Sequence, residues 1–135
     1  MNRREARNQA FMLLFQYKFQ ADEIFGLLED FFAENKVGAQ RGYIEGVVRG
    51  CIDKIEEIDG LINEYSKGWQ VDRISSVSVA ALRLGTYELL YEDDITLVVS
   101  VSEAVTLAKE FEGEEAAPFV NGILGSIKEK VSEKK

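Results

Sequence analysis

Residues 114–131, EEAAPFVNGILGSIKEKV, decide between an all-helical chain and one that contains a β-hairpin. The pair Asn121-Gly122 is a common hairpin signal, but a hairpin needs alternating apolar flanks. Here the apolar residues instead recur with a period of about 3.6, which predicts a helix. Pro118 fits the first turn of that helix, where its missing N–H would have no partner. Gly122 is unusual there, because a glycine inside a helix costs about 1 kcal/mol relative to alanine and needs a packing or functional reason.

The same periodicity predicts further helices over 3–19, 22–34, 39–65, 76–92 and 100–111, with a helical turn near 71–74. We expect Asp22 to cap the second helix and Ser100 with Glu103 to form a capping box. Residues 93–99 have some β-character but no partner strand, so they are predicted to be a loop. The fold class is therefore all-α, with about seven helices and short connections.

The segment 39–65 has the clearest helical pattern, and three glycines share one of its faces: Gly42, Gly46 and Gly50. This spacing indicates close approach of a neighbouring helix. Cys51 lies in the apolar stripe of the same helix and is expected to be buried. Trp69, in the connection that follows, is expected to seal the junction between two halves of the molecule.

Composition limits the possible functions. The chain has 135 residues, the size of one domain, and a net charge of −8, which argues against general nucleic-acid binding. Without histidine and with one cysteine, it lacks the residues of zinc sites and of His-based catalysis, and it has no phosphate-binding glycine motif. We therefore expect no cofactor, no metal and no enzymatic activity. No apolar stretch is long enough for a membrane span, so the expected location is cytoplasmic, with no membrane partner.

The first helix has two unusual features. Its basic residues are concentrated near the N-terminus, so a polyanion would have to dock there. Phe11, Phe15 and Phe19 form a second apolar row beside the main core stripe. This row is either part of a core that surrounds a central helix or a docking surface with aromatic anchors, and the sequence leaves both open.

Four stretches in order resemble one family, the transcription antitermination factor NusB. They are RREARNQAFMLLFQY at 3–17, LRLGTYELLYEDDI at 82–95, VSVSEAVTLAKEF at 99–111 and FVNGIL at 119–124. The likeness extends over nearly the whole chain. It implies a single domain, 1–135, built from two packed helical subdomains, 1–66 and 67–135.

The resemblance also implies a function. Such a protein binds the boxA sequence of ribosomal RNA leaders as a heterodimer with the small ribosomal subunit protein NusE, within an antitermination complex of RNA polymerase. The implied RNA-binding residues are Arg3, Arg4, Arg7, Phe119, Asn121 and Gly122. The implied partner-binding residues are Phe15, Phe19, Asp72, Arg73, Ser78 and Glu115. A homodimer is possible when the protein is alone.

The chain departs from the family pattern at three positions. The family usually has a basic residue where Pro118 stands, an acidic one at Ser78 and an asparagine at Ser102. Two alternatives remain open from the sequence. Asn121 and Gly122 serve either RNA contact or packing between helices, and the protein is either an RNA-binding adaptor or a protein-interaction module that does not bind RNA itself.

Overall fold

The computed structural model describes residues 1–134 and contains, within them, seven α-helices, three short 3₁₀ helices and no strand. The α-helices are α1 (Arg3–Tyr17), α2 (Ile24–Glu34), α3 (Arg41–Asp53), α4 (Ile55–Tyr65), α5 (Ser76–Tyr91), α6 (Leu97–Glu112) and α7 (Ala116–Glu133). The 3₁₀ helices are η1 (Ala21–Glu23), η2 (Gly38–Gln40) and η3 (Val71–Arg73). The prediction of an all-α fold with about seven helices is confirmed. No helix among the described residues is long and apolar enough to cross a bilayer.

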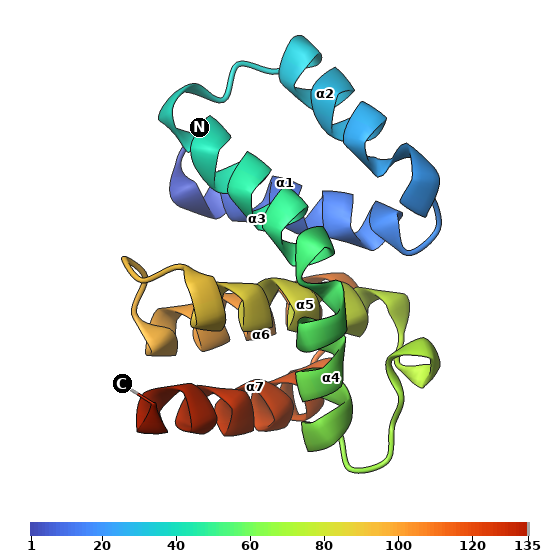
Figure 1. The fold of residues 1–135 in the computed structure, drawn as a ribbon, viewed down its shortest axis with the longest axis vertical. Coiled ribbons are helices and arrows are strands. Elements are labelled where there is room, and N and C mark those ends of the chain that lie inside the picture. Colours follow the sequence, from blue (N-terminus) through green and yellow to red (C-terminus); the bar gives the residue numbers. More distant parts are fainter. Residues whose placement is uncertain (135) are drawn as a thin grey trace.

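The helices form two layers that meet at α5. Figure 1 shows α1, α2 and α3 in one layer and α4, α5, α6 and α7 in the other. Helix α5 packs against α1 and α3 on one side and against α4, α6 and α7 on the other. Eleven of its sixteen residues are buried, as expected for a helix that is apolar nearly all round. This central helix holds the two layers together.

The predicted helix 39–65 is in fact two helices, α3 and α4, separated at Lys54 (φ −105°, ψ 22°). Apolar spacing continues unchanged across the break, so the pattern gives no sign of it. The cause is tertiary, because α3 packs on α1 and α5 whereas α4 turns to pack on α5 and α7. A division of the domain at residue 66 stays a prediction, and the packing of α4 favours a boundary nearer Lys54.

Close approach at the glycines of α3 occurs at only one position. A Cβ on Gly50 would lie 2.5 Å from ring atoms of Tyr87, whereas one on Gly42 or Gly46 would meet nothing within 4 Å. The expectation of a close helix along the whole face is therefore wrong. The neighbour is a single tyrosine ring from α5. Cys51 is buried as predicted, and burial raises the pKa of its thiol to about 12.

Helix starts and ends differ from the predictions in three places. Asp22 caps no helix, since it lies within η1 and α2 begins at Ile24. Helix α6 begins at Leu97, not at Ser100, because the hydroxyl of Thr96 accepts from the Val99 amide and caps it. The predicted loop 93–99 is therefore shorter than expected, because residues 97–99 belong to α6. Helix α1 ends at Tyr17, two residues early, whereas the turn near 71–74 is confirmed as η3.

A buried carboxylate joins four of the helices. Glu88 of α5 is 1% exposed and accepts from Arg7 Nε of α1 at 2.8 Å and from Ser100 Oγ of α6 at 2.9 Å. The hydroxyl of Tyr43 on α3 also donates to it. Burial and the negative charge of Glu88 raise the pKa of Tyr43, which therefore stays a neutral donor. Ser100, predicted to cap a helix, serves this network instead.

Candidate nucleic-acid and partner interfaces

The basic arm of α1 has one arginine that is free to reach solvent and one that lies flat on the protein. The side chain of Arg4 is 77% exposed and reaches Glu103 of α6 at 3.0 Å. Arg3 Nε donates to Gln40 at 2.8 Å, and its guanidinium lies over the Tyr43 ring, 4.3 Å from the centroid. Exposed ion pairs of this kind contribute little to stability. Arg4 can therefore exchange its carboxylate for another anion at low cost.

Arg7 is different, and the prediction that it faces RNA needs correction. The residue is 5% exposed, and its guanidinium donates to Glu88. Burial disfavours its charge, but the hydrogen bond and the negative charge of Glu88 outweigh that effect and raise the pKa of Arg7. RNA could reach this guanidinium only by breaking a buried ion pair. Arg7 anchors the arm and is not itself on the surface.

On α7, Asn121 and Gly122 are both exposed. Asn121 lines a groove of about 440 Å³ between α6 and α7, together with Val98, Val101, Ser102, Val105, Thr106, Lys109, Ala117 and Lys128. A Cβ added to Gly122 would meet nothing within 4 Å. The alternative in which a neighbouring helix lies against Gly122 is therefore wrong.

This open space makes Gly122→Ala a direct test. The variant should be more stable by about 1 kcal/mol, because it removes the helix penalty of glycine and adds no clash. If RNA approaches here, affinity for RNA should fall although stability rises. A urea titration and an RNA titration measure the two effects. Gly46→Ala is the matched control, since it also lies inside a helix with open space around it but on α3.

Unchanged RNA affinity in Gly122→Ala would remove Gly122 from the RNA site. A loss of stability would show that the open space at 122 is filled in solution.

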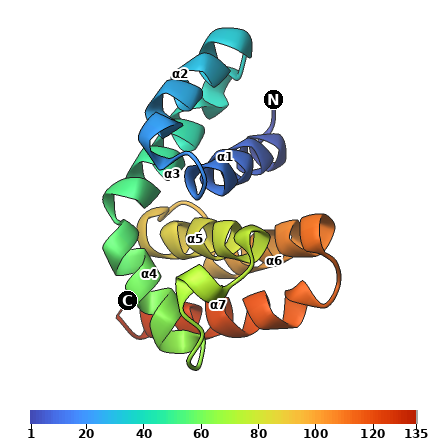
Figure 2. The same cartoon turned by 90° about the vertical axis from the view of Figure 1, so that its right-hand side faces the viewer.

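The surface of α6 connects the arm to the groove. Thr106 lines the α6–α7 groove with Asn121, and it also lines the hollow that contains Arg4 and Glu103. Helix α6 lies between α1 and α7 in Figure 2. Arg4 and Asn121, which belong to the predicted RNA-binding residues, therefore lie at two ends of one continuous surface.

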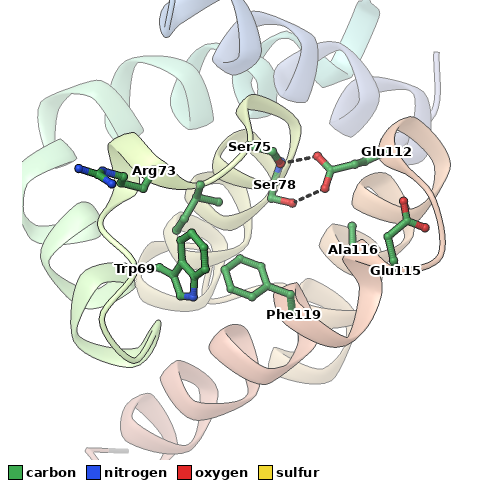
Figure 3. A pocket seen from close by; sticks show the side chains of 9 residues that line it. Trp69, Arg73, Ser75, Ser78, Glu112, Glu115, Ala116 and Phe119 are labelled. Carbon is green, nitrogen blue, oxygen red and sulfur yellow. Dashed lines mark hydrogen bonds between the residues drawn. The ribbon is translucent and has the colours of Figure 1, made fainter.

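Phe119 lies elsewhere. It lines a pocket with Trp69, Arg73, Ser78 and Glu115, between the connection 66–75 and the start of α7 (Figure 3). Phe119 was predicted to bind RNA, yet the structure groups it with three residues predicted to bind the partner protein. Its position two residues before Asn121 on a helix turns the two side chains to different sides of α7.

The remaining partner-binding candidates lie on the same side of the molecule as this pocket. Phe15 and Phe19 form an edge-to-face pair at the end of α1, with ring centroids 5.4 Å apart, and Phe19 is 63% exposed. Between them and η3, Lys18 Nζ donates to the carbonyl of Ile74 at 3.4 Å. Asp72 of η3 lines a pocket beside that lysine. All six candidates thus lie along the end of α1, η3 and the starts of α5 and α7.

The aromatic row of α1 is partly core and partly surface. Phe11 is 1% exposed and stacks on Phe111 of α6, with centroids 5.2 Å apart, whereas Phe15 is half-buried. Trp69 was expected to seal the junction between the halves, but it is 55% exposed. Its place in a connection after Gly68, outside any apolar helix stripe, was the available signal that it belongs to the surface.

Comparison with known proteins shows the family of the chain. The family model described as "NusB family" matches residues 4–129. The chain belongs to the NusB family. A transcription antitermination protein NusB from Acetivibrio thermocellus is 44% identical over 131 residues, which cover 94% of this chain and 88% of the relative.

Solved NusB structures have the same fold. The structure of T. maritima NusB superposes with a TM-score of 0.89 at 37% identity, and the match covers 96% of this chain and 92% of that one. A crystal structure of the antitermination factors NusB and NusE in complex with dsRNA matches with a TM-score of 0.80 at 28% identity, covering 95% and 96%.

Proposed function

We propose that this protein is a non-enzymatic, RNA-binding adaptor in transcription antitermination. It binds boxA-type RNA of ribosomal RNA leaders as a heterodimer with NusE, within an antitermination complex of RNA polymerase. Family membership supports the role, and so does the likeness to a NusB in complex with NusE and dsRNA. Such an adaptor works where RNA polymerase works, so its proposed location is the cytoplasm.

The observation that carries the proposal is the separation of two surfaces. The exposed arm residue Arg4 and the Asn121 groove share the α6 surface, while the exposed aromatic and η3 residues lie along the other end of α1. Two ligands can therefore bind at once without competing, as an adaptor requires.

RNA recognition at the α6–α7 groove depends on a few residues that line the groove. Asn121 offers both a donor and an acceptor to base edges, and Lys109 and Lys128 line the same groove. Single-stranded RNA is read through base edges of this kind, with nearby cations on its phosphates. The net charge of −8 opposes contact elsewhere, so RNA affinity should depend strongly on NusE.

The deciding experiment titrates fluorescently labelled boxA RNA with this protein alone, with NusE alone and with the two together. We expect NusE to tighten RNA binding by about tenfold or more, which is within the usual range of coupling between two sites. A scrambled RNA of the same length is the control for sequence preference. If NusE binds but RNA affinity of the pair stays at the level of NusE alone, the protein is an interaction module without RNA binding.

Arg4→Ala tests the arm. We expect weaker RNA binding and a slope of log affinity against log salt that falls by about 0.7, the value for one phosphate contact on a single strand. Helical content should not change, because the side chain is 77% exposed. Arg49→Ala is the control, since Arg49 is an arginine with a 42% exposed side chain that pairs with Glu29 and Glu45 on the α2–α3 side. Equal slopes for Arg4→Ala and the unmodified protein would exclude Arg4 from the RNA site.

A further inference from the structure

The pocket beside Trp69 is a partly apolar hollow of about 290 Å³ between the connection 66–75 and the start of α7. Trp69 and Phe119 stand side by side in it (Figure 3). Trp69 is 55% exposed, although an indole gains much from burial. An exposed tryptophan beside a second ring is typical of a binding surface, since tryptophan is enriched among the residues that dominate protein interfaces.

The rim of the pocket is acidic. The Glu112 carboxylate accepts from Ser78 Oγ at 3.3 Å and from the hydroxyl of Ser75, so it is fixed at the wall. Glu115 also lines the pocket, on the far side of Ala116 from the two rings, and Figure 3 shows the Arg73 side chain turned away from both carboxylates. Within residues 1–134, neither Glu112 nor Glu115 forms an ion pair. Two carboxylates without an ion pair thus line the same pocket as two aromatic rings.

We propose that this pocket binds an arginine or lysine side chain of the protein partner. The aliphatic stem lies against Trp69 and Phe119, and the cation lies over the indole face and points toward Glu112 and Glu115. Each part has a physical basis: long basic side chains bury their stems on apolar surfaces, cations bind the faces of indoles, and carboxylates form charge-assisted hydrogen bonds with them. This inference rests on the proposed function, because it specifies how the heterodimer partner docks.

The charges favour a basic protein over RNA as the occupant. A nucleobase could stack on Trp69, but its phosphates would then lie near Glu112 and Glu115, while Arg73, the basic residue that lines the pocket within residues 1–134, is turned away from both. The pocket also lies on the side of α7 away from the Asn121 groove, and it shares Arg73, Ser78 and Glu115 with the predicted partner-binding residues.

Trp69 is the only tryptophan of the chain, so its fluorescence reports on this pocket alone. The probe is NusE, with any tryptophan of its own replaced by phenylalanine. Adding it should shift the emission of Trp69 to shorter wavelength as the indole leaves water. Adding boxA RNA alone should leave the emission unchanged. Binding of labelled NusE is measured in parallel by fluorescence anisotropy, independently of Trp69.

Two variants test the aromatic and acidic parts. Trp69→Ala should weaken NusE binding by about tenfold, which corresponds to a cation–π contact that is removed from water, and Trp69→Phe should restore part of the loss. Glu112→Gln with Glu115→Gln should weaken binding and reduce its dependence on salt. Glu114→Gln is the matched control, because Glu114 is a neighbouring glutamate, 86% exposed, that does not line the pocket. Circular dichroism confirms that each variant is folded.

The outcomes separate this inference from the proposed function. If NusE binds Trp69→Ala with normal affinity, and if NusE leaves the emission of Trp69 in the unmodified protein unchanged, the pocket inference is overturned and the adaptor function stands. If RNA alone shifts the emission and Trp69→Ala weakens RNA binding, the pocket binds a nucleobase and the inference is also overturned. If NusE does not bind the unmodified protein at all, both proposals fail together.

Discussion

Replacing Glu88 by glutamine should lower the free energy of unfolding by about 3 kcal/mol, although the side chain keeps its shape. The substitution leaves the charge of Arg7 buried without its carboxylate, and breaking a buried ion pair in this way typically costs about 3 to 5 kcal/mol. The lower end of this range applies because a carboxylate oxygen of Glu103 lies 4.0 Å from Arg7 Nη1 and offsets part of the loss. Urea denaturation followed by circular dichroism measures the change.

A double variant shows whether the pair acts as a unit. Arg7→Gln with Glu88→Gln removes both charges, so it should be more stable than Glu88→Gln alone. Tyr43→Phe keeps the ring and removes only the hydroxyl that donates to Glu88, and should cost about 2 kcal/mol, as expected for a hydrogen bond to a charged group. Equal stability of Glu88→Gln and the unmodified protein would show that this carboxylate does not hold the layers together.

Phe11→Ala should lower the free energy of unfolding by about 3 to 5 kcal/mol, the usual cost of deleting a buried phenyl ring. Phe11 is 1% exposed and stacks on Phe111, so its removal opens a cavity between α1 and α6. Phe19→Ala is the matched control on the same row, because that ring is 63% exposed. It should cost little stability and should instead weaken NusE binding.

The same denaturation curves, combined with anisotropy titrations of labelled NusE, separate the two roles. If Phe19→Ala destabilises the fold as much as Phe11→Ala does, the end of α1 is covered in solution. If Phe11→Ala unfolds at the same urea concentration as the unmodified protein, the assignment of Phe11 to the core is wrong.

The fold was largely predictable because its main signal is local. Helical periodicity marks each α-helix, and the nearly uniform apolar circumference of α5 marks it as central. The break at Lys54 was not predictable, because apolar spacing continues through it and only packing on different neighbours separates α3 from α4. The start of α6 was missed because residues 93–99 have β-character and Ser100 with Glu103 fits a capping box, whereas Thr96 caps the helix.

The candidate site was less predictable, because it depends on contacts between distant residues. Arg3, Arg4 and Arg7 are equivalent in sequence, yet Glu88 removes Arg7 from the surface. Nor does the sequence tell which sides of α7 Phe119 and Asn121 face, since this depends on where α6 and the connection 66–75 lie. The open space around Gly122 likewise depends on the positions of neighbouring helices, which the sequence does not give.

The ion pair between Arg7 and Glu88 also bears on how the protein folds during synthesis. Its two residues are 81 positions apart, so the first helix leaves the ribosome long before its carboxylate does. Until α5 emerges, Arg7 keeps its hydration shell, and α1 has no central helix on which to bury its apolar face. The entropy of closing so long a loop is lost before the contact between Arg7 and Glu88 forms. This order slows the formation of non-local structure. We therefore expect the three N-terminal helices to remain incompletely packed until the second half of the chain has been synthesised. The protein should acquire its stable core late in translation.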